Sequence, residues 1–188
     1  MNSGGKGKLL VVTGPSGVGK STITKAVRSR VDVDFSVSAT TRKPREGEVD
    51  GRDYRFVDIE TFEAMIADNK LLEWADVFGN YYGTPAEPVL AAIENGRTVI
   101  LEIDIQGGLQ VSKKVPDGLY VLIVPPEKEE LRKRLESRGT EDEETLQRRL
   151  AKSEEELRMA RESGVYTHEI VNDELEAAID SLVELAGR

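Results

Sequence analysis

The sequence lacks the residues that build disulfide bonds and many metal sites. Its 188 residues include no cysteine and a single histidine, His168. Disulfide bonds, thiolate metal sites and histidine clusters are therefore excluded. No apolar run approaches the roughly 20 residues that span a bilayer, and the run Leu9–Val12 is too short for the core of a signal peptide. A reduced, cytoplasmic protein is the expectation.

The charge balance is acidic, with 35 Asp and Glu residues against 26 Lys and Arg and a net charge of -9. A nucleic-acid partner normally requires a basic face, so neither nucleic acid nor a membrane is expected as a partner. The length fits one compact domain of roughly 100–200 residues. If the ligands are anions, the cations that bind them must be concentrated locally.

Three short, continuous apolar runs have the character of strands buried on both faces: Leu9–Thr13, Thr98–Ile103 and Leu119–Val124. A helix is predicted at Ser21–Arg30, directly after the glycine-rich turn that follows the first run. Buried strands separated by helices indicate an α/β fold of three layers, in which a central parallel sheet carries helices on both faces.

The composition changes between the predicted strands. From Phe35 to about Gly96, polar, glycine and tyrosine residues surround one predicted helix, Thr61–Asn69, which indicates a small α+β insertion. We expect one compact unit with its core at 1–35, 97–126 and 160–188, the insertion at 36–96 and a helical lid at 127–159.

The C-terminal part contains a first predicted helix with Leu131 and Leu135, and two further helical patterns follow it. Thr140 and Glu143 form a capping box that opens the first of them. Its apolar positions, among many charges, are Leu146, Leu150 and Leu157. We expect this helix to be poorly buried and mobile, because it is polar nearly all round. The last helix should dock on the sheet through Leu175, Ala178, Ile179, Leu182 and Leu185.

Residues 14–21 read Gly-Pro-Ser-Gly-Val-Gly-Lys-Ser and fit the phosphate-binding loop G-x-x-x-x-G-K-S. Glycines let backbone N–H groups surround a polyphosphate, and the following helix adds its positive N-terminal end. Lys20 is expected to reach the β- and γ-phosphates, and the Ser21 hydroxyl to ligate Mg²⁺. The predicted nucleotide-binding residues here are Gly14, Pro15, Ser16, Gly17, Val18, Gly19, Lys20, Ser21 and Thr22.

Two other classes of phosphate-binding protein fit less well. Asp104–Gly107 matches D-x-x-G, the segment with which GTPases sense the γ-phosphate. The nearest string to their guanine motif N-K-x-D is Asn69–Leu72, which lacks the aspartate. A protein kinase is excluded because the chain has no H-R-D motif.

Several more motifs follow one another in a recognisable order and spacing. They are Ser36–Arg45 (S-V-S-A-T-T-R-K-P-R), Gly51–Tyr54, Glu73–Trp74, Asn80–Thr84 and Leu101–Gly107 (L-E-I-D-I-Q-G). With these motifs the sequence resembles the guanylate kinases from Leu9 to the C-terminal helix. The resemblance implies a nucleoside monophosphate kinase that transfers the γ-phosphoryl group of ATP to GMP, with Mg²⁺ as cofactor, and an insertion at 36–96 that binds GMP.

The resemblance also implies how GMP is bound. Arg42 and Arg45 suit its dianionic phosphate through forked, charge-assisted hydrogen bonds, and the hydroxyls of Tyr54 and Tyr82 add neutral donors. The Glu73 carboxylate can accept both the N1–H and the exocyclic amine of guanine, a donor pair that adenine lacks. The other implied base contacts are Ser38 and Thr84, as donors to O6, and Asp104, as a second acceptor.

The lid region is rich in arginine. Phosphoryl transfer needs cations over the migrating group, and a hinged lid delivers them after both substrates bind. The resemblance implies that Arg134, Arg138 and Arg149 do this, and it leaves Arg132 and Arg148 as surface residues. The expected catalytic residues are therefore Lys20, Arg42, Arg134, Arg138 and Arg149.

Three acidic residues and one amide complete the expected site. Asn172 is expected to contact the adenine of ATP, whereas Asp173 fits a helix cap equally well. Glu102 and Asp104 are candidates for holding Mg²⁺ through water. Direct in-line transfer with no covalent enzyme intermediate is expected, because a loose phosphoryl transition state requires positioning and charge more than a protein base.

Other interpretations of these residues stay open. Taken singly, Arg42 and Arg45 fit surface charges, and the tyrosines fit strand packing. Tyr81 and Trp74 are expected to pack, with Trp74 in the core. A non-catalytic module of this family would have a degraded phosphate loop, which the chain does not have, and a kinase for another base ranks third. The expected partners are ATP and GMP, with dGMP as a further candidate acceptor, for a monomer or weak homo-oligomer.

Overall fold

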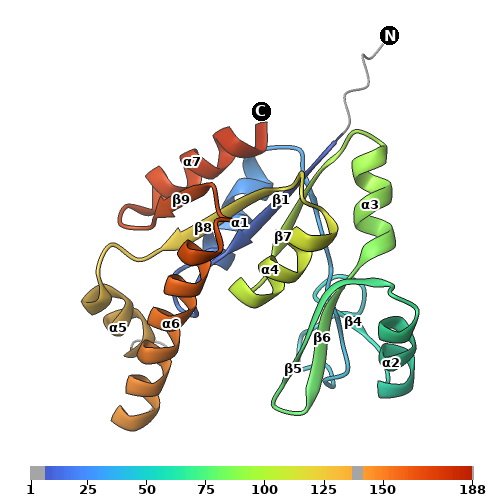
Figure 1. Ribbon diagram of the computed structural model, residues 1–188, viewed down its shortest axis with the longest axis horizontal. Helices are drawn as coiled ribbons and strands as arrows, with labels where there is room; N and C mark the ends of the chain where they lie inside the picture. Colours follow the sequence, from blue (N-terminus) through green and yellow to red (C-terminus); the bar gives the residue numbers. More distant parts are fainter. Residues whose placement is uncertain (1–6, 137–141, 188) are drawn as a thin grey trace.

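The computed structural model describes residues 7–136 and 142–187 (Figure 1). Its larger sheet has five parallel strands in the order β2-β7-β1-β8-β9. Their bounds are β1 Lys8–Thr13, β2 Asp34–Phe35, β7 Thr98–Glu102, β8 Leu119–Val124 and β9 His168–Val171. The predicted α/β class and its three strands are confirmed. Strands β2 and β9 have two and four residues, too few to produce an apolar run.

Helices cover both faces of this sheet, as predicted. They are α1 Lys20–Arg30, α3 Ala86–Glu94, α4 Ile105–Lys114 and α7 Leu175–Gly187. Successive residues of a strand point to opposite faces. Leu10 and Val12 of β1 therefore pack with α1 and α7, whereas Leu9 and Val11 pack with α3 and α4. β1 lies buried between two helical layers, which its continuous apolar sequence predicts.

The smaller sheet has four strands in the order β4-β3-β6-β5, with helix α2 packed against it through Phe62. The bounds are β3 Ala39–Thr40, β4 Arg55–Phe56, α2 Ile59–Ala67, β5 Leu71–Val77 and β6 Asn80–Pro85. All of them fall within 36–96. Helix α2 starts before Thr61 because the Asp58 side chain caps it by accepting from the Thr61 N–H. Helix α3 also falls within 36–96 but packs against β1 and β7 of the larger sheet.

Helices α5 and α6 occupy the segment predicted as a lid, at Lys128–Glu136 and Glu143–Ser163. They pack against each other through Leu131, Leu135, Leu146 and Leu150. Helix α6 is exposed over most of its 21 residues, as expected, and its buried residues are Leu146, Leu150, Ser153 and Ala160. Asp142 caps α6 by accepting from the Thr145 N–H. The predicted cap, Thr140, lies outside the described residues.

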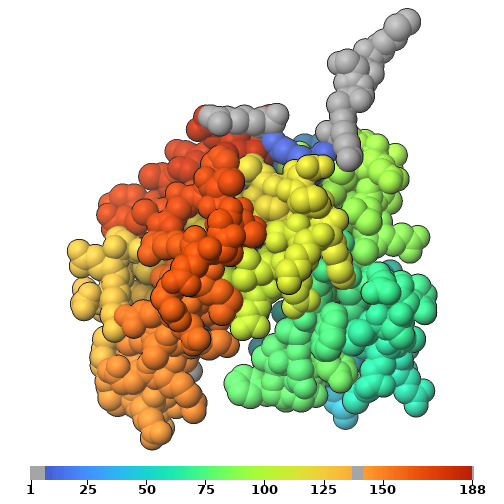
Figure 2. Space-filling view, in the orientation of Figure 1, coloured from blue at the N-terminus to red at the C-terminus, as the bar shows by residue number. Residues whose placement is uncertain are grey.

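A hollow separates the α5–α6 pair from the smaller sheet and α2 (Figure 2). Ligands of open α/β sheets bind outside the carboxyl ends of the strands, where the loop after β1 and the residues after β7 lie. None of the helices in the described part of the chain has both the length and the apolar character needed to cross a membrane.

Candidate active site

The loop between β1 and α1 requires glycine at specific positions. Gly14 and Gly19 have φ angles of 150° and 104°. A Cβ at Gly14 would lie 2.4 Å from the Ile123 carbonyl oxygen, and one at Gly19 would lie 2.4 Å from the Asn172 amide nitrogen. Glycine at both positions lets the backbone turn tightly and present its N–H groups to an anion.

The first turn of α1 carries the side chains expected to act on phosphate and metal. The Lys20 ammonium folds back over the loop and donates to the Gly14 and Pro15 carbonyl oxygens at 2.6 and 3.1 Å. The Ser21 hydroxyl donates to one Glu102 oxygen, and the Thr24 hydroxyl donates to the other at 2.6 Å. Glu102, at the end of β7, therefore holds the start of α1 beside the loop.

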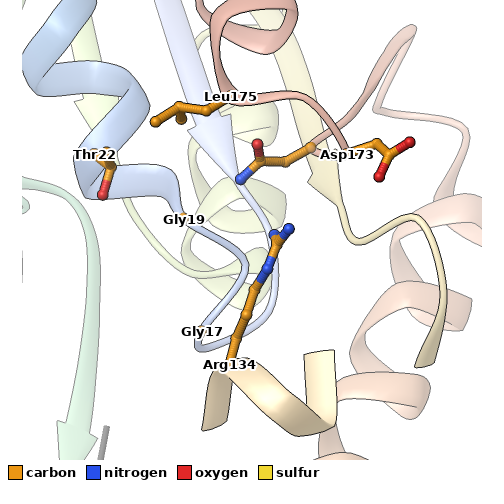
Figure 3. A pocket seen from close by; sticks show the side chains of 7 residues that line it. Gly17, Gly19, Thr22, Arg134, Asp173 and Leu175 are labelled. Carbon is orange, nitrogen blue, oxygen red and sulfur yellow. The ribbon is translucent and has the colours of Figure 1, made fainter. Parts of the chain in front are cut away.

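A pocket of about 310 Å³ opens beside this loop (Figure 3). It is lined by Gly17, Gly19, Thr22, Arg134, Asn172, Asp173 and Leu175. Figure 3 shows Arg134 rising from α5 beside the loop glycines. Its Nε donates to the Glu130 carboxylate at 3.0 Å, within α5. Leu175, predicted to dock on the sheet, is 40% exposed and lies at this pocket instead.

Asn172 has a role that its sequence context did not predict. It is buried, and its side-chain amide donates to the Val18 carbonyl oxygen at 2.7 Å. Its backbone N–H donates to the Val124 carbonyl oxygen at 2.8 Å. Asn172 thus connects the segment after β9 to the phosphate loop. It also lines the pocket, although its amide nitrogen donates to the Val18 carbonyl oxygen.

One arginine of α6 contacts the phosphate loop. The Arg149 guanidinium, on α6, donates to the Ser16 hydroxyl at 2.8 Å. Arg132, expected at the surface, binds Glu136 and Glu143 with side chains that remain partly exposed. Arg138 lies outside the described residues.

A second cluster, on the smaller sheet, surrounds Arg42. Its guanidinium donates to both oxygens of Glu48 at 2.8 and 3.0 Å and to the Tyr82 hydroxyl at 3.2 Å. The Arg45 backbone N–H donates to the same Glu48 carboxylate at 2.7 Å, and the Tyr54 ring lies 5.4 Å below the Arg42 guanidinium. The hydrogen bond to Arg42 lowers the pKa of Glu48. The structure thus brings Arg42, Tyr54 and Tyr82 together, with the Arg45 backbone adjoining them.

Glu48 is the member of this cluster that sequence reasoning missed. It follows the arginine-rich string by three residues, and nothing in its local sequence distinguishes it from the other acidic residues of the chain. A carboxylate that accepts from Arg42 and Arg45 orients the fork of Arg42 and occupies the kind of position that a phosphate would take.

The Glu73 carboxylate lies in a buried setting beside α4. Glu73 is 7% exposed, and one oxygen accepts from the buried Thr84 hydroxyl at 2.6 Å. The pKa of Glu73 is raised to about 7, mainly by burial; the nearby Asp104 charge acts in the same direction, and the hydrogen bond from Thr84 acts against it. Asp104 caps α4 by accepting from the Gly107 N–H at 2.7 Å. Ser38 is half-buried, and its carbonyl oxygen accepts from the Arg55 N–H.

The buried Glu73 predicts a dependence of stability on pH. A raised folded-state pKa favours folding below the ordinary value of 4.5, and this contribution is lost as the pH rises through about 7. The ligand-free protein should lose roughly 3 kcal/mol between these limits. Glu73→Gln should remove this loss, so urea unfolding at pH 5 and pH 8 compares the two proteins. An identical pH dependence of both would contradict the prediction.

The aromatic residues near Glu73 only partly follow expectation. Tyr81 packs as expected, stacked on Phe62 with ring centroids 5.3 Å apart. Trp74 was expected in the core, but it is 37% exposed and contacts Tyr81 edge-on. Trp74 points to the face of the small sheet opposite to Glu73, where it contacts Tyr81, and it stays partly exposed because β5 is an edge strand.

The described residues contain no group of three or more His, Asp or Glu side chains that could hold a metal by themselves. Mg²⁺ is usually held by one or two protein oxygens together with substrate phosphates. Ser21 and Glu102, which lie together at the phosphate loop, provide hard oxygen ligands of that kind. Asp104 follows two residues later and lies near Glu73. The donor set therefore fits a metal that arrives with a nucleotide.

The family model described as guanylate kinase matches residues 6–186. The guanylate kinase of Gloeobacter violaceus is 52% identical over 179 residues, which are 95% of this chain and 86% of that protein. The guanylate kinase of Thermosynechococcus vestitus is 50% identical over 94% of this chain and 91% of its own length.

Two solved structures are similar to this chain, and one of them is a guanylate kinase. A guanylate kinase from Anaplasma phagocytophilum superimposes with a TM-score of 0.75 at 31% identity, covering 96% of this chain and 85% of its own. A shikimate kinase from Bacteroides thetaiotaomicron, at 14% identity and a TM-score of 0.51, covers 96% of this chain and 99% of its own. The second likeness concerns the fold alone.

Proposed function

The chain belongs to the guanylate kinase family, and we propose on that premise that it transfers the γ-phosphoryl group of ATP to GMP, giving ADP and GDP. The observation that carries the choice of acceptor is the buried Glu73 carboxylate opposite the first turn of α4. Guanine offers the adjacent N1–H and amine donors that one carboxylate accepts, whereas adenine would leave a buried carboxylate unpaired. The same site admits dGMP as a candidate, since these contacts involve only the base.

The donor nucleotide is proposed to bind at the phosphate loop. Loop N–H groups and the start of α1 hold its phosphates, and Lys20 exchanges its contacts to Gly14 and Pro15 for phosphate oxygens. The adjoining pocket, with Arg134, Asn172 and Asp173, receives the adenosine. Ser21 directly, and Glu102 and Asp104 through water, would hold Mg²⁺, which would supply positive charge against the phosphates of the donor.

The acceptor phosphate is proposed to bind at Arg42, with Arg45, Tyr54 and Tyr82 as further donors. Glu48 orients the Arg42 guanidinium in the ligand-free protein through two hydrogen bonds. A dianionic phosphate can accept the same pair of hydrogen bonds and carries more negative charge than the carboxylate. Ser38 and Thr84 lie on the guanine side of this unit. The base and the phosphate are therefore read by two separate clusters on one small sheet.

Transfer is proposed to be direct and in line, with no phosphorylated enzyme. Arg149 already contacts the phosphate loop, and Arg134 lies beside it, so α5 and α6 bring cations to the migrating group. The proposal gives Arg138 the same task. The hollow between α5–α6 and the small sheet narrows on closure, which excludes water as a competing acceptor.

The products test this proposal directly. Incubation with MgATP and GMP should give ADP and GDP in equal amounts, measured by anion-exchange chromatography. Excess EDTA should stop the reaction, because the metal helps to neutralise the phosphates. ADP without GDP would mean transfer to water. GMP binding without either product would identify a non-catalytic module of the family.

A further inference from the structure

Helix α4 holds the backbone of the strand that carries Glu73. The Gln110 side chain donates to the Trp74 carbonyl oxygen at 3.0 Å and accepts from the Trp74 N–H at 3.2 Å. β5 is an edge strand of the small sheet, so both of these backbone groups would otherwise face outward. One side-chain amide thus takes the place of a neighbouring strand at the residue that follows Glu73.

A second side chain of α4 forms a hydrogen bond to the backbone of β5 on the other side of Glu73. The Lys114 ammonium donates to the Leu71 carbonyl oxygen at 2.6 Å. Between these two attachments the pairing of β5 with β6 shifts register, at Leu71 and Glu73. A bulge of this kind re-aims a side chain and weakens the local ladder. The irregularity that directs Glu73 is therefore fixed to α4 on both sides.

The same helix forms the opposite wall of the site. Its cap is Asp104, and a Cβ at Gly107 in its first turn would lie 3.1 Å from a Glu73 carboxylate oxygen. Glycine at this position leaves room between the helix and the carboxylate. Because α4 is a rigid element, its side chains at 110 and 114 set how far Glu73 lies from this first turn.

We propose that Gln110 and Lys114 are specificity-determining positioning residues, which fix the Glu73 carboxylate against α4 so that it accepts from both donors of the guanine edge. They touch no substrate and act through Glu73. The inference rests on the proposed function in one respect, namely that Glu73 reads the base. With Gln110 removed, we expect the bulge to relax, so that Glu73 keeps its bond to N1–H of guanine and loses its bond to the exocyclic amine.

Calorimetric titration of Gln110→Ala with GMP and IMP tests this. IMP keeps N1–H but lacks the exocyclic amine, so it reports a single bond to Glu73. We expect GMP affinity to fall about tenfold and IMP affinity to change little, because one charge-assisted bond is lost. Gln110→Glu keeps the acceptor and Gln110→Lys keeps the donor. The GMP affinity of both variants should therefore lie between that of wild type and that of Gln110→Ala. Lys114→Ala should act in the same direction as Gln110→Ala.

The neighbouring Lys113, exposed on the same helix, provides the control, and Lys113→Ala should leave both affinities unchanged. A loss of GMP and IMP affinity by equal factors, together with a lower Tm, would mean that Gln110 only supports the fold. If Gln110→Ala does not fold, Gln110→Glu serves for the same comparison.

A double-mutant cycle separates this inference from the function on which it rests. Gln110→Ala should weaken GMP binding in the wild-type background and have no effect in a Glu73→Gln background, since it acts through that carboxylate. Equal effects in both backgrounds would overturn the positioning role. If Glu73→Gln alone leaves GMP binding intact, the assignment of Glu73 as the reader of the base fails instead.

Discussion

Replacing Arg149 with alanine is expected to lower kcat about a thousandfold, within the range measured when a single arginine that stabilises a phosphoryl transition state is removed. The Arg149 guanidinium lies at the phosphate loop through its bond to Ser16, where the migrating group is proposed to pass. Its charge matters most in the transition state, so the KM values for MgATP and GMP should change much less than kcat. Steady-state kinetics at saturating substrates measure this loss.

The next residue gives a matched control for this prediction. Arg148 is exposed on the same turn of α6, and Arg148→Ala should leave kcat within about twofold of wild type, as surface changes usually do. Thermal unfolding should show similar Tm values for both variants, because neither residue belongs to the leucine cluster that joins α5 and α6. A comparable loss of kcat in both variants would contradict the assignment of Arg149.

The second large effect is expected at Lys20. Lys20→Met keeps the aliphatic stem but removes the ammonium that now bridges the Gly14 and Pro15 carbonyl oxygens. We expect kcat to fall by about 10²–10³, the cost of removing one preorganised donor from a developing charge. MgATP binding should weaken as well, since Lys20 is proposed to hold ground-state phosphates.

Lys25 lies one and a half turns later on α1 and is exposed, so Lys25→Met removes the same charge away from the loop. We expect it to retain nearly full activity. If Lys25→Met and Lys20→Met lost activity equally, net charge rather than position would explain the effect, and the proposed role of Lys20 would be wrong.

Local sequence patterns predicted those strands and turns whose conformation depends mainly on neighbouring residues in the chain. The apolar runs of β1, β7 and β8 and the glycines of the phosphate loop follow from backbone conformation and burial alone. Strands β2 and β9 could not be predicted, because two and four residues gain their structure from pairing with β7 and β8. The narrow buried side of α6 was predicted in part, through Leu146 and Leu150, whereas the burial of Ala160 depends on contact with the sheet, which the local sequence does not show.

The site shows the same limit. The phosphate loop could be predicted from the residues alone, because its chemistry requires those residue types at fixed spacing, whereas the arginines were assigned from the family resemblance. The roles of Glu48, Gln110 and the Asn172 side chain could not be predicted. Each acts through a hydrogen bond to a partner that only the tertiary fold brings near. Trp74 was placed in the core from its residue type, but it lies on an edge strand and stays 37% exposed.

The most direct test of the proposed activity is ADP formation from MgATP with GMP, AMP, UMP, CMP and dTMP as parallel acceptors. We predict activity with GMP alone in this set, because a guanine edge alone offers a donor pair that satisfies the buried Glu73 carboxylate. Equal activity with AMP would contradict the role of Glu73, and no activity with any acceptor would contradict the assignment of this chain as a kinase.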